Sequence, residues 1–232
     1  MTVLDLLARR VQRDGARPLL TWYDLADSAR TELSAISWAN WVDKTANLLI
    51  DEYDLGPGDV VQLDVLGERP RHWMGLVWAA ACWRAGCLAS VADTDSADLL
   101  VTGPNPPSDP DVPTLACSLH PLGLGLRDLP AGVADYATEA RLQPDSFLGG
   151  PADPAAPAWR DADTELSLAD LESPAIADRI EVTASAPFPV IAQAVLGPLA
   201  GGGSAILLED TGNTDSAQLR RRVLADEKVA TA

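Results

Sequence analysis

Segments with the pattern of β-strands alternate with helical segments along most of this 232-residue chain. Short apolar runs predict strands at residues 60–65, 87–91, 99–102, 114–118, 179–183 and 205–209, and a further strand that only begins at 228–232. Helical spacing of apolar residues predicts helices at residues 70–85, 133–142, 190–199 and 216–226. Parallel strands need crossover connections, and helices usually provide them. The order therefore predicts an α/β fold with a mostly parallel sheet flanked by helices.

The start of the chain predicts a helix, a hairpin and a second helix. Leu4, Leu7 and Val11 share one face of an amphipathic helix. Two short strand candidates follow at residues 19–23 and 30–36. Ser37 is a candidate N-cap for the next helix, because a serine hydroxyl accepts a hydrogen bond from the first helical turn.

The longest apolar run, Met74 to Trp83, is about half as long as a membrane-spanning helix. It predicts a buried helix, and the N-terminal residues lack the apolar stretch of a secretory signal. We therefore expect a cytoplasmic protein without a membrane span. Trp73, Trp78 and Trp83 drift around this helix, so we expect part of its surface to be buried against a second subunit.

Acidic residues outnumber basic residues by 34 to 17, which gives a net charge of −17. Residues 1–90 hold 12 acids and 9 bases, whereas residues 91–232 hold 22 acids and 8 bases. Such a surface repels the phosphates of nucleic acids and of anionic membranes. The charge therefore argues against a nucleic-acid partner.

Cysteine and histidine are too few and too scattered to predict a metal centre or a disulfide framework. Cys82, Cys87 and Cys117 form no Cys-x-x-Cys pair, so we expect buried, reduced thiols. Neither His72 nor His120 has a cysteine or histidine at ligand spacing, and His72 is expected at the surface or at a helix start. No serine lies in a Gly-x-Ser-x-Gly context, so no hydrolase triad is predicted.

Three blocks of the sequence carry a family resemblance when they are taken together. The first is SWANWVDKTANLLIDEYDLGPGD (37–59), a helix that ends in a Gly-x-Gly-Asp turn. The second is VVQLDVLGERPRHWMGLVWAAACWRAGCLASV (60–91), and the third is DRIEVTASAPFPVIAQAVLGPLAGGGSAILLE (178–209). In order and spacing they resemble the N-terminal part of the AMP-dependent synthetases and ligases, which form adenylates from ATP and a carboxylate. The chain also resembles a small actinobacterial family distantly related to those enzymes.

The resemblance implies a phosphate loop within residues 151–175, but the residues that such a loop needs are absent there. In the superfamily the loop is rich in glycine, serine and threonine and ends in Pro-Lys-Gly, because backbone amides and a lysine hold the phosphates. Residues 151–175 contain no glycine and no lysine, and six carboxylates face the single cation of Arg160. We interpret this stretch as a solvated acidic loop. Magnesium binding by Asp161, Asp163 and Glu165 is the alternative.

Two further segments are candidate binding sites. Gly201 to Ser204 has the composition of an anion-binding nest, but it leads from a helix into a strand, so we favour a helix-ending turn. Phe188 stands where the synthetases build part of their acyl pocket. We interpret Phe188 as a core residue, or alternatively as part of a small ligand pocket with Ser185 and Thr164.

We therefore predict one α/β domain over residues 1–232, with a first sheet region at 1–150, the acidic loop at 151–175 and the last α/β units at 176–232. The motifs that the superfamily uses later in its sequence, for adenine, for ribose and for the catalytic lysine, do not occur before Ala232. We expect no catalytic residue, no metal and no tightly bound ATP or other cofactor.

The functional hypothesis is a catalytically inert synthetase-like protein that acts as a binding or interaction module. A domain shorter than a synthetase would expose surfaces that the full enzyme covers, which predicts a homodimer or another protein partner. Two alternatives stay open. One is a ligase-like fragment that activates a carboxylate, completed in trans by a second polypeptide. The other is a sensor of an acyl group or acyl-CoA.

Overall fold

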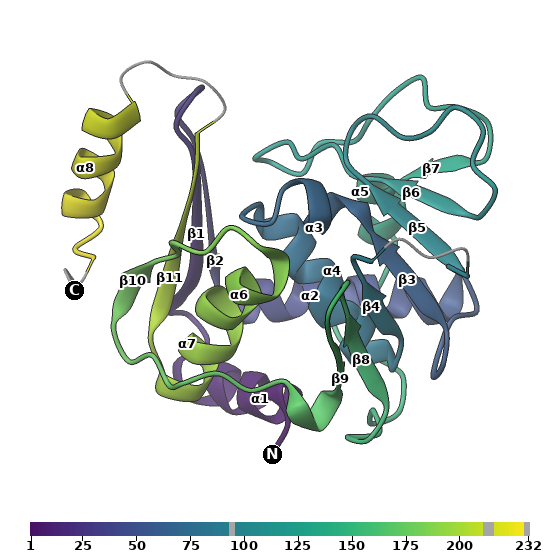
Figure 1. Cartoon of the computed structure of the whole chain (residues 1–232), viewed down its shortest axis with the longest axis horizontal. Helices are drawn as coiled ribbons and strands as arrows, with labels where there is room; N and C mark the ends of the chain where they lie inside the picture. The colour runs from purple at the N-terminus through teal and green to yellow at the C-terminus, as the bar shows by residue number, and fades with distance from the viewer. Residues whose placement is uncertain (93–95, 211–215, 230–232) are drawn as a thin grey trace.

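The structure is a computed structural model that describes residues 1–92, 96–210 and 216–229. Within these ranges the strands form two sheets (Figure 1). The order in the four-stranded sheet is β10 (Arg179–Glu181), β11 (Ser204–Glu209), β1 (Pro18–Asp24), β2 (Ala29–Ser34). The order in the seven-stranded sheet is β7 (Val133–Asp135), β6 (Thr114–Ala116), β5 (Leu99–Thr102), β3 (Val60–Leu63), β4 (Leu88–Ser90), β8 (Pro157–Arg160), β9 (Glu165–Ser167).

Most neighbouring strands run parallel, so the predicted α/β fold is confirmed. The antiparallel pairs are the β1–β2 hairpin, which the sequence predicts, and the β8–β9 hairpin, which it does not. β1 pairs in parallel with β11, so the start of the chain shares a sheet with residues close to its end. The predicted strands therefore belong to two sheets rather than to one.

Helices lie between the two sheets and around them (Figure 1). They are α1 (Val3–Asp14), α2 (Ala35–Asp51), α3 (Asp64–Glu68), α4 (Trp73–Ala85), α5 (Tyr136–Arg141), α6 (Pro187–Ile191), α7 (Gly197–Gly201) and α8 (Ser216–Asp226). A π-helical segment, η2 (Ala192–Leu196), joins α6 to α7, and a 3-10 turn, η1 (Leu168–Asp170), follows β9. α2 contacts β1 and β2, α4 contacts β3 and β4, and α2 and α4 pack on each other. The two sheets therefore share one hydrophobic core.

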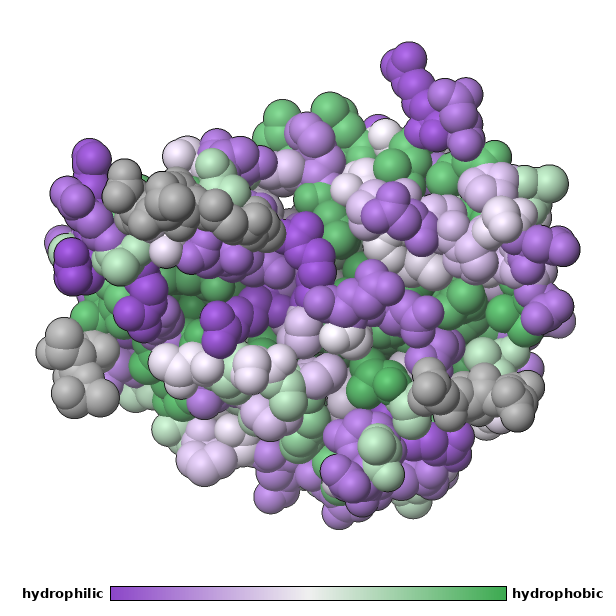
Figure 2. Space-filling model, turned by 45° about the horizontal axis from the view of Figure 1, so that its top comes forward, coloured by the Kyte–Doolittle hydropathy of each residue, from purple (hydrophilic) through white to green (hydrophobic). Residues whose placement is uncertain are grey.

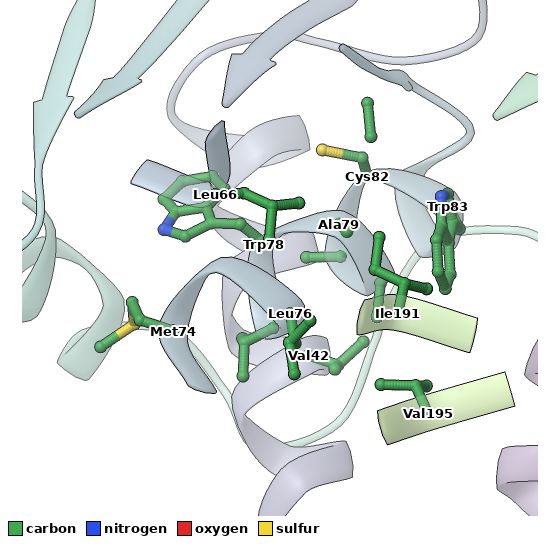
Figure 3. Packing of buried hydrophobic residues seen from close by; sticks show 14 of the residues in the cluster. Val42, Leu66, Met74, Leu76, Trp78, Ala79, Cys82, Trp83, Ile191 and Val195 are labelled. Carbon is green, nitrogen blue, oxygen red and sulfur yellow. The ribbon is translucent and has the colours of Figure 1, made fainter. Parts of the chain in front are cut away.

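Helix α4 is the centre of that core, because every one of its residues except Arg84 is buried. The exposed fractions of Trp73, Trp78 and Trp83 are 2%, 0% and 1%. The expectation that part of this helix packs on a second subunit is wrong, since the chain itself covers all three indoles. Figure 3 shows the packing around α4, with side chains from α2, α6 and η2.

The helix ends follow the expected capping chemistry, with one shift. The N-cap of α2 is Ser34 rather than Ser37, and its side chain accepts a hydrogen bond from the Ser37 amide at 3.1 Å. The strand β2 therefore runs directly into the helix. Gly86 and Gly202 end α4 and α7 in the left-handed conformation, so the interpretation of the glycine run at 201–204 as a helix-ending turn is confirmed.

Several predicted boundaries differ from the structure. Residues 133–142 are not one helix, because β7 pairs with β6 and Asp135 then caps α5 by accepting from the Thr138 amide at 2.9 Å. The strand predicted at 60–65 ends at Leu63, where α3 begins. The strand predicted at 228–232 is absent at Lys228 and Val229, and its other residues lie outside the described ranges.

His72 and the cysteines are buried. The imidazole of His72 has no exposed surface, and its Nδ1 accepts from the Met74 amide at 3.2 Å as the N-cap of α4. The predicted helix-start position is thus confirmed and the surface position is wrong. The cysteines are free and buried, as expected, and burial raises the pKa of the Cys87 and Cys117 thiols to about 12.

Figure 2 turns the upper edge of Figure 1 forward, and polar residues cover most of that face, with apolar residues in patches between them. No helix in the described ranges combines the length and the hydropathy that crossing a bilayer requires.

Candidate functional site

The segment predicted as an acidic loop contains the β8–β9 hairpin. β8 extends the seven-stranded sheet by pairing in parallel with β4, where Ala89 lies opposite Trp159 and Ser90 lies opposite Arg160. β9 then returns antiparallel to β8. Ala158 and Trp159 are buried, with exposed fractions of 2% and 0%. The expectation of a solvated loop over 151–175 is therefore wrong for this part, because half of β8 belongs to the core.

Asp161 organises the turn of the hairpin. Its backbone amide donates to the Thr164 carbonyl at 2.9 Å and closes the turn. Its carboxylate accepts from the Asp163 amide at 3.0 Å and from the Trp159 indole Nε1–H at 3.0 Å. A side chain that bonds the backbone two residues ahead is a common turn-forming device of aspartate. The carboxylate thus has a structural role that its spacing did not reveal.

The guanidinium of the hairpin is paired with a carboxylate of the same hairpin. The guanidinium of Arg160 donates from Nε to a carboxylate oxygen of Glu165 at 2.8 Å. No three acidic, histidine or cysteine side chains converge into a metal-binding group anywhere in the described ranges. Asp161, Asp163 and Glu165 therefore do not form the magnesium site that their spacing allowed.

Phe188 lies in the first turn of α6 and reaches the hairpin through Trp159. The two ring centroids are 5.6 Å apart at an interplanar angle of 40°. Phe188 is half-buried at the edge of the core, in accord with a packing role. Thr164 and Ser185 are exposed, and neither they nor Phe188 line the cavities next to α1 and α8. The structure thus joins Phe188 to the hairpin, and a ligand pocket that it shares with Ser185 and Thr164 stays a prediction.

Two residues that no sequence motif singles out, Arg71 and Gln193, hold the loop between β10 and α6. Arg71 donates from Nε to the Ala184 carbonyl at 2.8 Å and from Nη2 to the Thr183 carbonyl at 2.9 Å. The amide oxygen of Gln193 accepts from the backbone amides of the same two residues, at 3.0 and 3.2 Å. The segment that leads into Phe188 is therefore fixed from both sides. An arginine beside an apolar helix is the only sequence signal for this, and it names no target.

No protein-family model matches the chain. A Mycobacterium tuberculosis (strain ATCC 25618 / H37Rv) protein described as "TIGR03089 family protein" is 33% identical over 243 residues, which cover 98% of this chain and 94% of that protein. Among solved structures, an acyl-CoA synthetase from Brucella canis matches with a TM-score of 0.71 and 19% identity. That match covers 99% of this chain and 46% of the synthetase, so the chain spans less than half the length of the enzyme that it resembles. The expected fold relationship to the N-terminal part of such synthetases is confirmed.

Proposed function

The chain belongs to the TIGR03089 family, and we propose that it is a binding or interaction module that has the synthetase fold without the adenylate-forming reaction. The observation that carries this proposal is the β8–β9 hairpin. It stands where the resemblance to synthetases puts the phosphate loop. A phosphate loop needs free backbone amides and a cation, and the hairpin offers neither in a usable form.

Two amides of the turn are already bonded within the hairpin. The Asp161 amide donates to Thr164, and the Asp163 amide donates to the carboxylate of Asp161. That carboxylate is an anion built into the turn, and it takes the amide that a phosphate oxygen would require. Opening the turn would also leave the Trp159 indole without its acceptor, at a cost of about 1–3 kcal/mol.

The charges of the turn also disfavour a nucleotide. Asp163 and Glu165 are exposed there, and the one guanidinium of the hairpin, Arg160, is paired with Glu165. Two like charges ~4 Å apart at an effective dielectric constant of ~20 repel each other by about 4 kcal/mol. Since 1.4 kcal/mol is about a factor of ten, one carboxylate at that distance would weaken phosphate binding by roughly a thousandfold.

ATP–pyrophosphate exchange tests this proposal directly. The purified protein is assayed with a panel of carboxylates, alone and with lysate from its source, and MgATP binding is measured by calorimetry. We expect no carboxylate-dependent exchange and no MgATP binding. Exchange by the pure protein would contradict the proposal, and exchange only with lysate would favour the fragment completed in trans.

The position of Phe188 keeps an acyl sensor as a second candidate. Its ring is half-buried and lies on Trp159, so an acyl chain could replace solvent on its open side. Thermal stabilisation by acyl-CoA but not by ATP, lost in Phe188→Ala, would favour this sensor. The control is Phe147→Ala, which removes the other phenylalanine, at a place where Arg84 covers the ring.

We also propose that a second copy of the chain covers the apolar surface around α5. Leu122 and Leu142, which follows directly on α5, are 77% exposed, and Leu148, whose amide donates to Asn47 of α2, is 70% exposed. Arg141 of α5 donates to the Gly123 carbonyl and so ties the loop of Leu122 to this helix. Light scattering after gel filtration is expected to give a dimer, and Leu122→Ser with Leu142→Ser is expected to give a monomer. A wild-type monomer at micromolar concentration would contradict this assignment.

A further inference from the structure

Arginine is concentrated at the start of this otherwise acidic chain. Residues 1–17 hold two acids and four bases, Arg9, Arg10, Arg13 and Arg17, which is a net charge of +2. Residues 18–232 hold the remaining 32 acids and 13 bases, which is −19 and restores the total of −17. The basic residues therefore form a local cationic region on α1 and the turn after it.

One face of α1 combines this charge with an apolar residue. Leu6, Arg9, Arg10 and Arg13 are three, four and seven residues apart, which places them along one side of a helix. That side faces α7, and the two helices lie next to each other at the lower end of the molecule (Figure 1). A cavity of about 380 Å³ lies between them, lined by the three arginines and by Leu6 and Leu199.

A second cavity of about 350 Å³ continues the first one toward the 3-10 turn. Both are lined by Met1, Leu6 and Ala200, so they adjoin. The second cavity adds Leu171 and Leu196, whose exposed fractions are only 4% and 2%. The two cavities together form the α1–α7 groove, with a cationic end at the arginines and a second end at the two leucines, where Glu172 and Ser173 also line the wall.

The cationic end is built on a fixed guanidinium. Arg10 is 4% exposed and donates to the carbonyls of Gly202 and Gly203, at the end of α7. Burial lowers the pKa of Arg10, and the charges of Arg17 and Arg13 lower it further, against the opposing effect of Asp14. An anion in the groove would relieve this repulsion.

The two exposed arginines at this end are available to a ligand. In the described part of the chain, Arg9 makes no ion pair, and its Nη1 contacts only the sulfur of Met1 at 3.0 Å. Arg13 pairs with its neighbour Asp14 at 2.9 Å, on a side chain that is 68% exposed. Exposed pairs of this kind contribute at most about 1 kcal/mol, so a ligand can displace the pairing at little cost.

We propose that the α1–α7 groove binds an amphipathic anion, with a carboxylate or phosphate head on Arg9 and Arg13 and an aliphatic tail on Leu6, Leu171 and Leu196. Each cavity is at the lower end of the range of small-molecule sites, about 300–1,000 Å³, and this size fits a small ligand better than a membrane surface. The net charge of −17 also repels an anionic bilayer as a whole. The site is separate from the hairpin, so it does not depend on the absence of adenylation.

Calorimetric titration with dodecanoate, below its micelle concentration, tests the groove. Two control ligands are titrated in the same way. Acetate has the carboxylate head without the aliphatic tail, and octyl glucoside has an aliphatic tail with an uncharged head. The test variant is Arg9→Gln with Arg13→Gln, both at exposed positions, and the matched control is Arg221→Gln with Arg222→Gln on α8, which changes the net charge equally. Leu6→Gln tests the apolar half.

We expect dodecanoate to bind the wild type and the α8 control equally, and to bind the α1 double variant about tenfold or more weakly, because charge-assisted hydrogen bonds are lost. Leu6→Gln should weaken the binding of dodecanoate and leave the weak binding of acetate unchanged. Added salt should reduce the affinity of the wild type more than that of the α1 variant. No dodecanoate binding, equal loss in both double variants, or equally tight binding of octyl glucoside would overturn the proposal. Capture of anionic vesicles or of an acidic peptide without dodecanoate binding would overturn it as well.

Discussion

The burial of His72 predicts a specific dependence of stability on pH. The imidazole is fully buried between Trp22 and Trp73, at ring-centroid distances of 4.6 and 5.8 Å. Burial, followed by the positive charge of Arg69, lowers the pKa of His72 to about 3, although the Leu119 backbone opposes the shift. In the unfolded chain the pKa is about 6.5. Between these two values the unfolded chain binds a proton that the folded chain does not.

The sign and the size of the effect follow from linkage. The contribution of neutral, buried His72 to stability is fully present above pH 6.5 and falls as the pH drops toward 3, by about 1.4 kcal/mol per pH unit within that window. From pH 7 to pH 5 the loss from this one group is about 2 kcal/mol.

Urea denaturation followed by tryptophan fluorescence, at several values between pH 7 and pH 5, measures the effect. The variant His72→Asn keeps a side-chain acceptor for the Met74 amide and removes the titration. We expect it to be less stable at pH 7 and to lose about 2 kcal/mol less than the wild type by pH 5. His120→Asn, which removes the exposed histidine, should keep the wild-type slope. Equal slopes for the wild type and His72→Asn would refute the reasoning.

Three further changes test the packing and the loops around the candidate site. Gly201→Ala places a Cβ 2.3 Å from the carbonyl oxygen of Ile176, so we expect a loss of about 1–3 kcal/mol in urea denaturation. Gly67→Ala is its control, because a Cβ there meets nothing within 4 Å, and the gain in helix propensity should stabilise by up to about 1 kcal/mol. Asp161→Ala removes the acceptor of two donors, the Trp159 indole and the Asp163 amide, and should lower the free energy of unfolding by about 1–3 kcal/mol. Calorimetry should show that this variant does not bind MgATP. A stable variant that binds MgATP would contradict the role assigned to this carboxylate. Arg71→Met should speed hydrogen exchange at residues 183–186 and leave α8 unchanged, and equal protection in both proteins would contradict the bracing of that loop.

The parts of the fold that sequence predicts well are those that local pattern determines. β5 and α8 have the predicted bounds, and the β1–β2 hairpin and the apolar helix α4 are where periodicity places them. The predicted boundaries of helices and strands are wrong where one polar residue ends a strand and caps the next helix. Asp135 closes β7 and caps α5 in the same step, and Ser34 does so between β2 and α2. The sequence predicts that a capping residue is present. Which of several serines or aspartates acts as the cap depends on where the pairing of the preceding strand ends.

The candidate site is harder to predict because long-range contacts define it. A Pro- and Ala-rich segment followed by aspartates has weak strand propensity, and only its pairing with β4 makes Pro157–Arg160 a strand. The sequence shows that residues 151–175 lack lysine and glycine. It does not predict the hydrogen bond from the Trp159 indole to the Asp161 carboxylate. The expectation for the tryptophans of α4 is wrong for a related reason. The spacing of apolar residues around a helix indicates how many faces of the helix are apolar. It does not indicate whether the same chain or a second subunit covers those faces.

The hairpin explains how this fold can persist without a phosphate loop. What the core requires of the segment is a strand beside β4 and a buried indole, and β8 supplies both through Ala158 and Trp159. The turn beyond that strand lies outside the core, so its content is free to change provided that its backbone groups stay bonded. Asp161 meets this condition with its own amide and carboxylate. A phosphate loop leaves its amides open for a ligand and relies on that ligand to bond them, whereas here the amides of Asp161 and Asp163 are bonded within the turn. Closure of the turn by Asp161 is therefore compatible with a stable sheet, and under the proposed function it takes the place of a bound nucleotide.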